Sequence, residues 1–264
     1  MRYARIHVGH ERSWAALDGT SVRLLHRAPW LGLAPTGDVF ANDGLTLDSP
    51  VSPGKIVCVG RNYRAHAREL GQEVPSEPLL FLKPPSAVIG PGDDVALPPQ
   101  SARVEHEGEL AVVIGRRLFD VAPPEALAGV FGYTCANDVT ARDLQRRDVQ
   151  FTRGKGFDTF CPVGPWIETD AGCANPAAVL LTRVNGVLRQ RGTVGEMVFP
   201  IGELLAYISS VMTLEPGDLV LTGTPEGVGP LAHGDRVEVE ITGVGTLVHG
   251  VRTRPVKTLE GDPR

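Results

Sequence analysis

Cysteine is scarce in this sequence, and basic residues do not outnumber acidic ones. The 264 residues include only four cysteines, at positions 58, 135, 161 and 173, and none has the C-x-x-C spacing of a zinc or redox site. The formal net charge is −5, and no run of lysine and arginine supplies a local field for nucleic acid. We therefore expect buried free thiols and no nucleic-acid partner.

Long apolar segments are also missing. No stretch approaches the roughly 20 apolar residues that a membrane span requires. The N-terminus, Met1–Arg5, leads into mixed polar sequence instead of the apolar region of a signal peptide. These absences predict a cytoplasmic location and no membrane partner.

Glycine and proline, by contrast, are abundant. The chain has 31 glycines and 22 prolines without periodicity, and only 6% of its residues are aromatic. This composition favours many turns and short strands over long helices. Hydrophobic residues make up 42% of the chain, which is enough for a sizeable core at this length. The predicted fold class is therefore mainly β with a few helices.

The chain divides near residue 53. Residues 1–53 alternate short apolar stretches with turn residues, and they predict a small β-rich N-terminal domain. Residues 54–264 form the larger domain. We find neither an internal repeat nor a low-complexity linker between the two parts.

Several patterns predict strands in the larger domain. Apolar runs next to glycine predict short strands at residues 55–60, 109–114 and 218–221. An Asn-Gly dipeptide predicts a type I′ hairpin over residues 180–190. Apolar residues that alternate with polar ones predict a second, half-buried hairpin over residues 237–251.

Helix signals are fewer. Apolar residues at helical spacing, preceded by proline, predict a helix over residues 201–212. A Pro-Pro pair followed by alanine and leucine predicts a shorter helix over 123–130. Residues 61–70 are polar and compatible with a third helix.

Four acidic residues near two strand ends are candidates for a metal site. Glu105, Glu107 and Glu109 are spaced by two, so on a strand they would share one face. Asp138 follows a run of small and apolar residues and can bring a further carboxylate to the same core edge. Converging carboxylates are costly to desolvate unless a cation compensates them, and a hard divalent ion takes such oxygen ligands. The residues alone leave two alternatives open: a strand end that displays solvated acids, and an Asp138 that only caps a turn.

Three other features point toward chemistry. His66 and Glu69 are neighbours on a helical turn, so Glu69 can orient His66 as a general base, although a surface ion pair has the same spacing. Lys155 stands between two glycines and is either a solvated loop residue or one that approaches a small anion. The glycine-rich segment 223–229 can present backbone amides to an anion, but it matches no nucleotide-binding motif.

Taken in order along the chain, these segments resemble the fumarylacetoacetate hydrolase family. The resemblance covers residues 54 to 258 and rests on V-G-R-N-Y at 59–63 with His66 and Glu69, L-F-L-K-P at 80–84, H-E-G-E at 106–109, N-D-V-T-A-R-D-L-Q at 137–145, Lys155, V-N-G at 184–186, L-E-P-G-D at 214–218 and T-G-T-P at 222–225. The N-terminal piece is similar to the accessory domain of bacterial members close to 2-hydroxyhepta-2,4-diene-1,7-dioate isomerases.

This resemblance implies a mixed β-sandwich roll, usually dimeric, that holds Mg²⁺ or Mn²⁺. By position the metal ligands are Glu107, Glu109 and Asp138. Glu105 lies outside that ligand set and is expected either beside it or in solvent. We therefore expect a homodimer with one divalent ion bound per chain.

The resemblance also implies roles for residues around the metal. His66 and Glu69 would form a catalytic dyad on a lid, and Lys155 is a third candidate catalytic residue. The residues implied to bind the substrate are Arg61, Tyr63, Arg142, Gln145 and Thr224.

The implied activity is that of a metal-dependent enzyme acting on a 2-oxo or 2-enol dicarboxylate through a stabilised enolate. The preferred assignment is a 2-hydroxyhepta-2,4-diene-1,7-dioate isomerase, or the related 5-oxopent-3-ene-1,2,5-tricarboxylate decarboxylase of aromatic catabolism. Acylpyruvate hydrolysis and oxaloacetate decarboxylation remain alternatives. An alternative of another class is a non-catalytic protein that binds metal and carboxylate.

Overall fold

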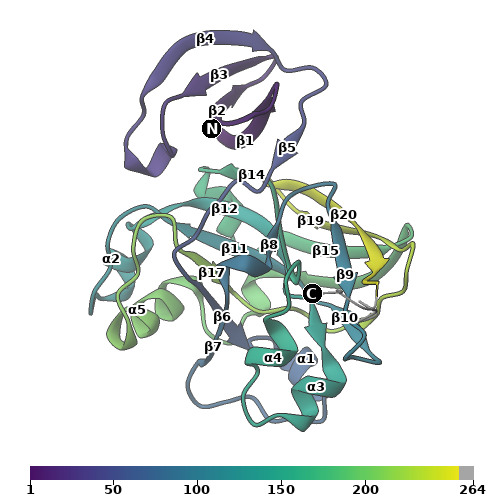
Figure 1. Cartoon of the computed structure of the whole chain (residues 1–264). Coiled ribbons are helices and arrows are strands. Elements are labelled where there is room, and N and C mark those ends of the chain that lie inside the picture. The colour runs from purple at the N-terminus through teal and green to yellow at the C-terminus, as the bar shows by residue number, and fades with distance from the viewer. Residues whose placement is uncertain (256–264) are drawn as a thin grey trace, which may run out of the picture.

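The N-terminal part is β-rich, as its alternating pattern predicts, and it adds strands to the main sheet. The computed structural model describes residues 1–255 (Figure 1). The N-terminal strands are β1 (Arg2–Val8), β2 (Glu11–Asp18), β3 (Ser21–Leu25), β4 (Pro35–Ala41) and β5 (Leu47–Asp48). Strand β1 pairs with β14 (Cys161–Glu168), and Tyr3 lies opposite Ile167. The ring of Trp30 packs edge-on against Trp14 and Phe131, which further ties this part to the rest of the chain.

The centre of the main sheet positions the functional residues described below. From β14 inward its strands are β12 (Val130–Asn137), β11 (Gly108–Ile114), β17 (Leu219–Leu221), β6 (Ile56–Gly60) and β7 (Leu79–Lys83), with β8 (Val88–Ile89) beside β14. Strands β11 and β12 are antiparallel, with Gly108 opposite Asn137. The end of β12 therefore lies beside the start of β11. The predicted strands 55–60, 109–114 and 218–221 are all confirmed.

A second sheet packs near the first and contains both predicted hairpins. Its order is β16 (Val187–Thr193), β15 (Val179–Val184), β19 (Arg236–Ile241), β20 (Gly245–Thr253) and β9 (Asp94–Leu97). Asn185 and Gly186 have φ angles of 53° and 76°, as a type I′ turn requires. A third, small sheet contains β13 (Thr140–Ala141), β10 (Val104–His106) and β18 (Gly229–Pro230). Together these sheets confirm the mixed β fold class.

The helices are short, and two predictions about them need correction. The α-helices are α1 (Arg64–Glu69), α2 (Pro123–Leu127), α3 (Arg142–Arg147), α4 (Thr152–Lys155) and α5 (Ile201–Val211). Helix α2 ends before residue 130, because Gly129 accepts backbone hydrogen bonds from Gly115 and Arg116 and the chain then enters β12. Lys155 is not in an open loop, since it is the last residue of α4. Figure 1 places α1, α3 and α4 at the end of the molecule away from β1 to β5.

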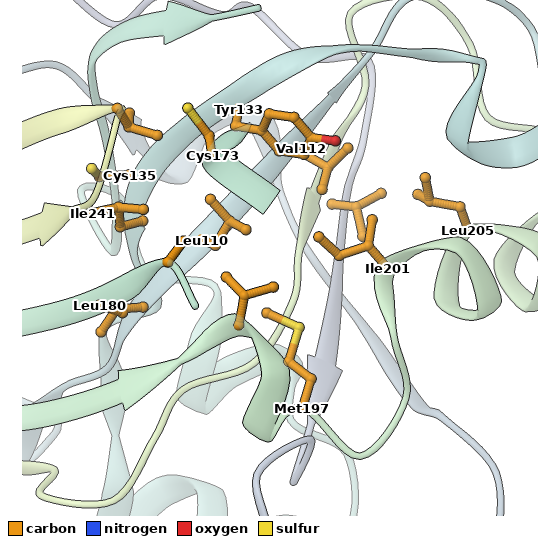
Figure 2. Close-up of a cluster of buried hydrophobic side chains, with 14 of the residues drawn as sticks. Leu110, Val112, Tyr133, Cys135, Cys173, Leu180, Met197, Ile201, Leu205 and Ile241 are labelled. Atoms are coloured by element: carbon orange, nitrogen blue, oxygen red, sulfur yellow. The ribbon is translucent and has the colours of Figure 1, made fainter. Parts of the chain in front are cut away.

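The main core lies between the central strands, the second sheet and α5. Figure 2 shows Leu110 and Val112 of β11 near Leu180 of the second sheet and Ile201 of α5. The alternate β11 residues Ala111 and Val113 belong to a separate buried cluster on the opposite side of the strand. Strand β11 is thus buried on both faces, which gives a rigid base for the side chains at its start.

The scarcity of cysteine and the lack of long apolar segments each led to a prediction about the structure. All four cysteines are free and buried, as predicted. Within residues 1–255, every helix is too short or too polar to cross a bilayer.

Candidate metal centre and active site

Three buried carboxylates converge where β12 meets β11. Glu107, Glu109 and Asp138 each offer an oxygen, and these oxygens all lie within 4.8 Å of one another. Each residue is at most 3% exposed. The strand register produces the cluster: the backbone N–H of Asp138 donates to the carbonyl of Glu107 at 2.8 Å. The structure therefore brings together the three residues that the resemblance implied.

Glu105 does not join this cluster. The chain passes from β10 in the small sheet to β11 in the main sheet at Glu107, so the three glutamates do not lie on one continuous strand. Glu105 is 2% exposed and accepts hydrogen bonds from the Nε atoms of Arg103 and Arg142, at 2.5 and 2.6 Å. The expectation of a solvated Glu105 is wrong, because Arg142 joins it to Glu107 inside the protein.

Buried cations surround the cluster. Lys155 donates to Glu107 Oε2 at 2.6 Å and to Asp138 Oδ2 at 2.5 Å, and its ammonium lies 4.9 Å from the centre of the Phe81 ring. Lys83 donates to Asp138 Oδ1 at 2.6 Å. The solvated alternative for Lys155 is wrong. Lys83 was given no role from the sequence, although its position at the end of an apolar run placed it in one of the motifs.

The charges of the cluster are unevenly balanced. Burial alone would raise the pKa of Glu107, but the Lys155 ammonium and the Arg142 guanidinium outweigh it and hold the pKa well below its usual value. For Glu109, burial and then the charges of Asp138 and Glu107 raise the pKa well above the usual value. Within residues 1–255 the only hydrogen bond to the Glu109 carboxylate comes from the backbone N–H of Gly223, at 2.6 Å.

This imbalance fits a divalent cation. An ion shared by the three carboxylates would compensate the charge of Glu109, which is paired with no cation within residues 1–255. The donor set consists of carboxylate oxygens only, which suits hard ions such as Mg²⁺, Mn²⁺ or Ca²⁺ better than ions that prefer nitrogen or sulfur. Glu107, Glu109 and Asp138 are therefore the residues that would hold the metal.

The His66–Glu69 pair faces the cluster. His66 is 4% exposed and lines the same cavity as Glu107 and Asp138, whereas Glu69 is exposed, so the pair is not confined to the surface. Its Nδ1 lies 3.2 Å from Glu69 Oε2, and the other oxygen of Glu69 accepts from the backbone N–H of Gly227 at 3.0 Å. Because a carboxylate accepts, Nδ1 carries the proton and Nε2 is the nitrogen left to act as a base.

The glycine-rich segment positions this pair and the metal ligands. Its amides do approach anions, but these are the chain's own carboxylates, Glu69 and Glu109. Gly227 has a φ of 98°, and a Cβ there would lie 2.0 Å from the carbonyl oxygen of Arg189. Only glycine allows this close approach, so the segment works as a backbone support for the site.

A cavity opens beside the carboxylates. Among the predicted site residues it is lined by His66, Arg61 and Lys155 together with Glu107, Asp138, Arg142 and Gln145. Gln145 accepts from Arg142 at 2.5 Å. Apolar side chains also line it, among them Phe81 and Phe151 in edge-on contact, and the exposed Arg146 is a further lining residue. A small anionic molecule with an apolar middle matches this lining.

Tyr63 and Thr224 do not reach the cavity. Tyr63 is 2% exposed in the main core, and its buried hydroxyl has no hydrogen-bond partner within the described chain. The Thr224 hydroxyl donates to the carbonyl of Gly108 at 2.8 Å and accepts from Gln190 at 2.7 Å. Neither side chain lines this cavity, and the substrate contacts that the resemblance implies for the two residues stay a prediction.

A chain of polar contacts supports Glu107 from the second sheet. The backbone N–H of Glu107 donates to the side-chain oxygen of Asn137, and the Asn137 amide nitrogen lies 2.9 Å from His249 Nε2. His249 Nδ1 lies 3.0 Å from the carbonyl of Gly250, which can only accept. His249 is therefore neutral, with its proton on Nδ1. No sequence signal marked His249, since its partner is 112 residues away.

His249 makes stability depend on pH. Burial lowers its pKa from 6.5 to about 4. The unfolded chain binds this proton at a higher pH than the folded chain, so the stabilisation is complete above pH 6.5 and is lost as pH falls toward 4. Between pH 7 and pH 5 we expect wild type to lose about 2 kcal/mol through this residue, and His249→Gln to lack that loss.

Urea unfolding of chelator-treated protein at the two pH values measures the difference. His10→Gln is the matched control, because His10 is exposed. Its pH dependence should equal that of wild type. Equal pH dependence for His249→Gln and wild type would contradict the assignment.

Two family descriptions match the chain in succession. Residues 55–252 match the C-terminal domain of fumarylacetoacetate hydrolase, and residues 1–50 match the N-terminal domain described as Rv2993c-like.

Individual proteins match over most of the chain. The 2-hydroxyhepta-2,4-diene-1,7-dioate isomerase from Mycobacterium marinum is 41% identical with a TM-score of 0.88, over 97% of this chain and 100% of that one. The mitochondrial oxaloacetate tautomerase FAHD2A of Homo sapiens is 44% identical over 230 residues, which are 83% of this chain and 73% of that protein. The maleylpyruvate hydrolase from Sphingobium sp. SYK-6, solved with manganese(II) ion and pyruvate, is 33% identical with a TM-score of 0.78, over 97% of this chain and 100% of that one.

Proposed function

The chain belongs to the fumarylacetoacetate hydrolase family and is an enzyme of that family, and from this premise we propose that it moves a proton on a 2-enol or 2-oxo dicarboxylate. The preferred reaction is that of a 2-hydroxyhepta-2,4-diene-1,7-dioate isomerase. The observation that carries the proposal is the His66–Glu69 pair, which holds a histidine base beside the carboxylate cluster. The base takes a proton from one position of the conjugated acid, and the proton returns at another, so the product is an isomer.

Mg²⁺ or Mn²⁺ on Glu107, Glu109 and Asp138 is part of this proposal. The bound ion would supply positive charge beside the oxygens of the 2-oxo acid and so stabilise the enolate. The all-oxygen donor set and the manganese(II) ion in the maleylpyruvate hydrolase support this assignment. A homodimer and a cytoplasmic location also remain predictions.

The cavity lining favours proton transfer over covalent catalysis. Within residues 1–255 the lining includes no serine, threonine or cysteine, so this part of the chain places no hydroxyl or thiol nucleophile in the cavity. Lys155 lines the cavity with its ammonium on Glu107 and Asp138, where it can also bind a substrate carboxylate. The intact dyad and carboxylate cluster argue against the non-catalytic alternative.

Two arginines support a dicarboxylate substrate. Arg142 and Lys155 are bonded to carboxylates of the site, but within residues 1–255 no carboxylate is paired with Arg61 or Arg146. Arg61 donates to the carbonyl of Glu73 at 3.0 Å, and its buried Nε has no partner in that range. We assign these two guanidinium groups to the substrate carboxylate that lies far from the metal.

Oxaloacetate tautomerisation is the second candidate. It is favoured by the 44% identity to the human oxaloacetate tautomerase. Oxaloacetate also carries two carboxylates, and its keto–enol exchange needs the same proton transfer. Decarboxylation and acylpyruvate hydrolysis are the other possible outcomes of the assay below.

A panel of three substrates, assayed with Mg²⁺ or Mn²⁺, tests the proposal. The substrates are the hydroxydienedioate, enol-oxaloacetate and an acylpyruvate. We expect the hydroxydienedioate to isomerise, seen by ultraviolet absorbance, without release of CO₂ and without cleavage products. Turnover of enol-oxaloacetate to the keto form alone would favour the second candidate. CO₂ release equal to substrate loss would assign a decarboxylase, and two cleavage products from an acylpyruvate would assign a hydrolase.

Arg61→Met tests the substrate orientation. Loss of a charged hydrogen bond should raise KM for a dicarboxylate about 10- to 100-fold. KM for the half-ester that lacks the distal charge should change much less. Arg64→Met is the matched control, because Arg64 is exposed on α1 and does not line the cavity. Equal effects on the diacid and the half-ester would contradict this role for Arg61.

A further inference from the structure

Lys83 is a cation of the metal centre that the cavity does not reach. It is the last residue of β7, its side chain is 0% exposed, and it does not line the cavity. Its ammonium donates to Asp138 Oδ1 at 2.6 Å and to the carbonyl of Val139 at 3.2 Å. A substrate in the cavity cannot contact it, so any role of Lys83 is exerted through Asp138.

In both Asp138 and Glu107, one carboxylate oxygen is bonded to Lys155 and the other to a different cation. Asp138 Oδ1 is held by Lys83 and Glu107 Oε1 by Arg142. The second oxygen of each carboxylate is shared with Lys155, which lines the cavity. A carboxylate oxygen has more than one lone pair, so the oxygens bonded to Lys155 can still bind a metal.

We propose that Lys83 is a positioning residue that makes Asp138 a ligand through one oxygen and thereby favours Mg²⁺ and Mn²⁺ over Ca²⁺. This inference rests on the metal centre in the proposed function. Ca²⁺ takes six to eight oxygens and readily accepts both oxygens of one carboxylate, whereas Mg²⁺ requires near-octahedral coordination. Both oxygens of Asp138 accept from a lysine, but Lys83 is also held by the Val139 carbonyl and does not reach the cavity, whereas Lys155 lines the cavity and can turn from Oδ2 toward a substrate carboxylate. The fixed ammonium on Oδ1 therefore opposes binding of one ion through both oxygens.

Charge neutralisation alone would give Lys83 a different role. A buried lysine beside a buried aspartate can simply keep the carboxylate paired. In that case its removal would change the affinity for every divalent ion by a similar factor. Discrimination between ions is therefore the property that separates positioning from neutralisation.

The test measures Mg²⁺, Mn²⁺ and Ca²⁺ binding by calorimetry on metal-stripped protein. For Lys83→Met we expect Mg²⁺ and Mn²⁺ affinity to fall about 10- to 100-fold, as is typical when a group that orients a metal ligand is lost. Ca²⁺ affinity should fall much less, so the ratio of Mg²⁺ affinity to Ca²⁺ affinity should fall by about tenfold or more. Lys55→Met is the matched control, since Lys55 pairs with Asp218, which is not one of the clustered carboxylates.

A crystal structure with Ca²⁺ provides the second readout. In Lys83→Met, both oxygens of Asp138 should lie at about 2.3 to 2.6 Å from Ca²⁺, whereas wild type should use one. If Lys83→Met does not fold, Lys83→Gln replaces it, because glutamine is one atom shorter and uncharged but keeps the polar character of the site. It should show the same change in ion preference to a smaller degree.

The outcomes separate this inference from the function on which it rests. An equal change in the affinity for all three ions, or no change, would overturn the role of Lys83 while the metal centre stands. Failure of wild type to bind any of the three ions would overturn the metal centre itself.

Discussion

Replacing Asp138 by asparagine is expected to abolish divalent-ion binding and turnover together. The change removes one of three carboxylates whose oxygens lie within 4.8 Å of one another. It also removes the negative charge that both Lys83 and Lys155 contact. A metal that stabilises an enolate contributes several kcal/mol, so its loss should lower kcat/KM by about 10³-fold or more. Calorimetric titration with Mn²⁺ and the isomerisation assay measure the two effects.

Asp143→Asn is the matched control for this substitution. Asp143 lies five residues further along the chain and accepts from the Ser101 hydroxyl and the Ala102 amide. It belongs neither to the carboxylate cluster nor to the cavity wall. Its variant should keep Mn²⁺ affinity near that of wild type. Unchanged Mn²⁺ affinity in Asp138→Asn would instead remove Asp138 from the candidate ligand set.

The convergence of the three carboxylates could be predicted because it depends on strands that the sequence marks clearly. The apolar run over 109–114 and the small-residue run before Asp138 are both buried strands, and acids at their ends meet when the strands pair. The roles of the individual residues came from the resemblance, since the local pattern alone allowed solvated acids. Glu105 shows the limit, because spacing cannot reveal that the chain changes sheets at Glu107.

Residues with distant partners could not be predicted. Lys83 contacts Asp138 across 55 positions, and His249 contacts Asn137 across 112. Such pairs depend on which strands become neighbours, and local patterns in one sequence do not reveal that. Tyr63 lies in a motif beside the dyad, and the motif alone did not indicate that its side chain packs among core residues.

Replacing His66 by alanine is expected to remove the chemical step while leaving the metal centre intact. His66 is held through Nδ1 by Glu69, and it lines the cavity without belonging to the carboxylate cluster. Loss of a positioned general base should lower kcat by about 10²- to 10⁴-fold. Mn²⁺ affinity should stay near that of wild type. Glu69→Gln should lower kcat less. The imidazole remains, and only its orientation and its stabilisation by the negative charge of Glu69 are weakened.

Oxalate binding separates a base from a binding residue. Oxalate has two carboxylates and no proton to transfer, so in the presence of Mn²⁺ it reports on the metal and its surrounding cations. We expect oxalate affinity in His66→Ala to remain close to that of wild type while kcat falls. Arg68→Gln is the control on the same helix, since Arg68 is exposed and lies outside the cavity lining. If oxalate affinity fell as steeply as kcat, His66 would bind the substrate, and the proton transfer would have to be assigned to another group that lines the cavity, with Lys155 the first to test.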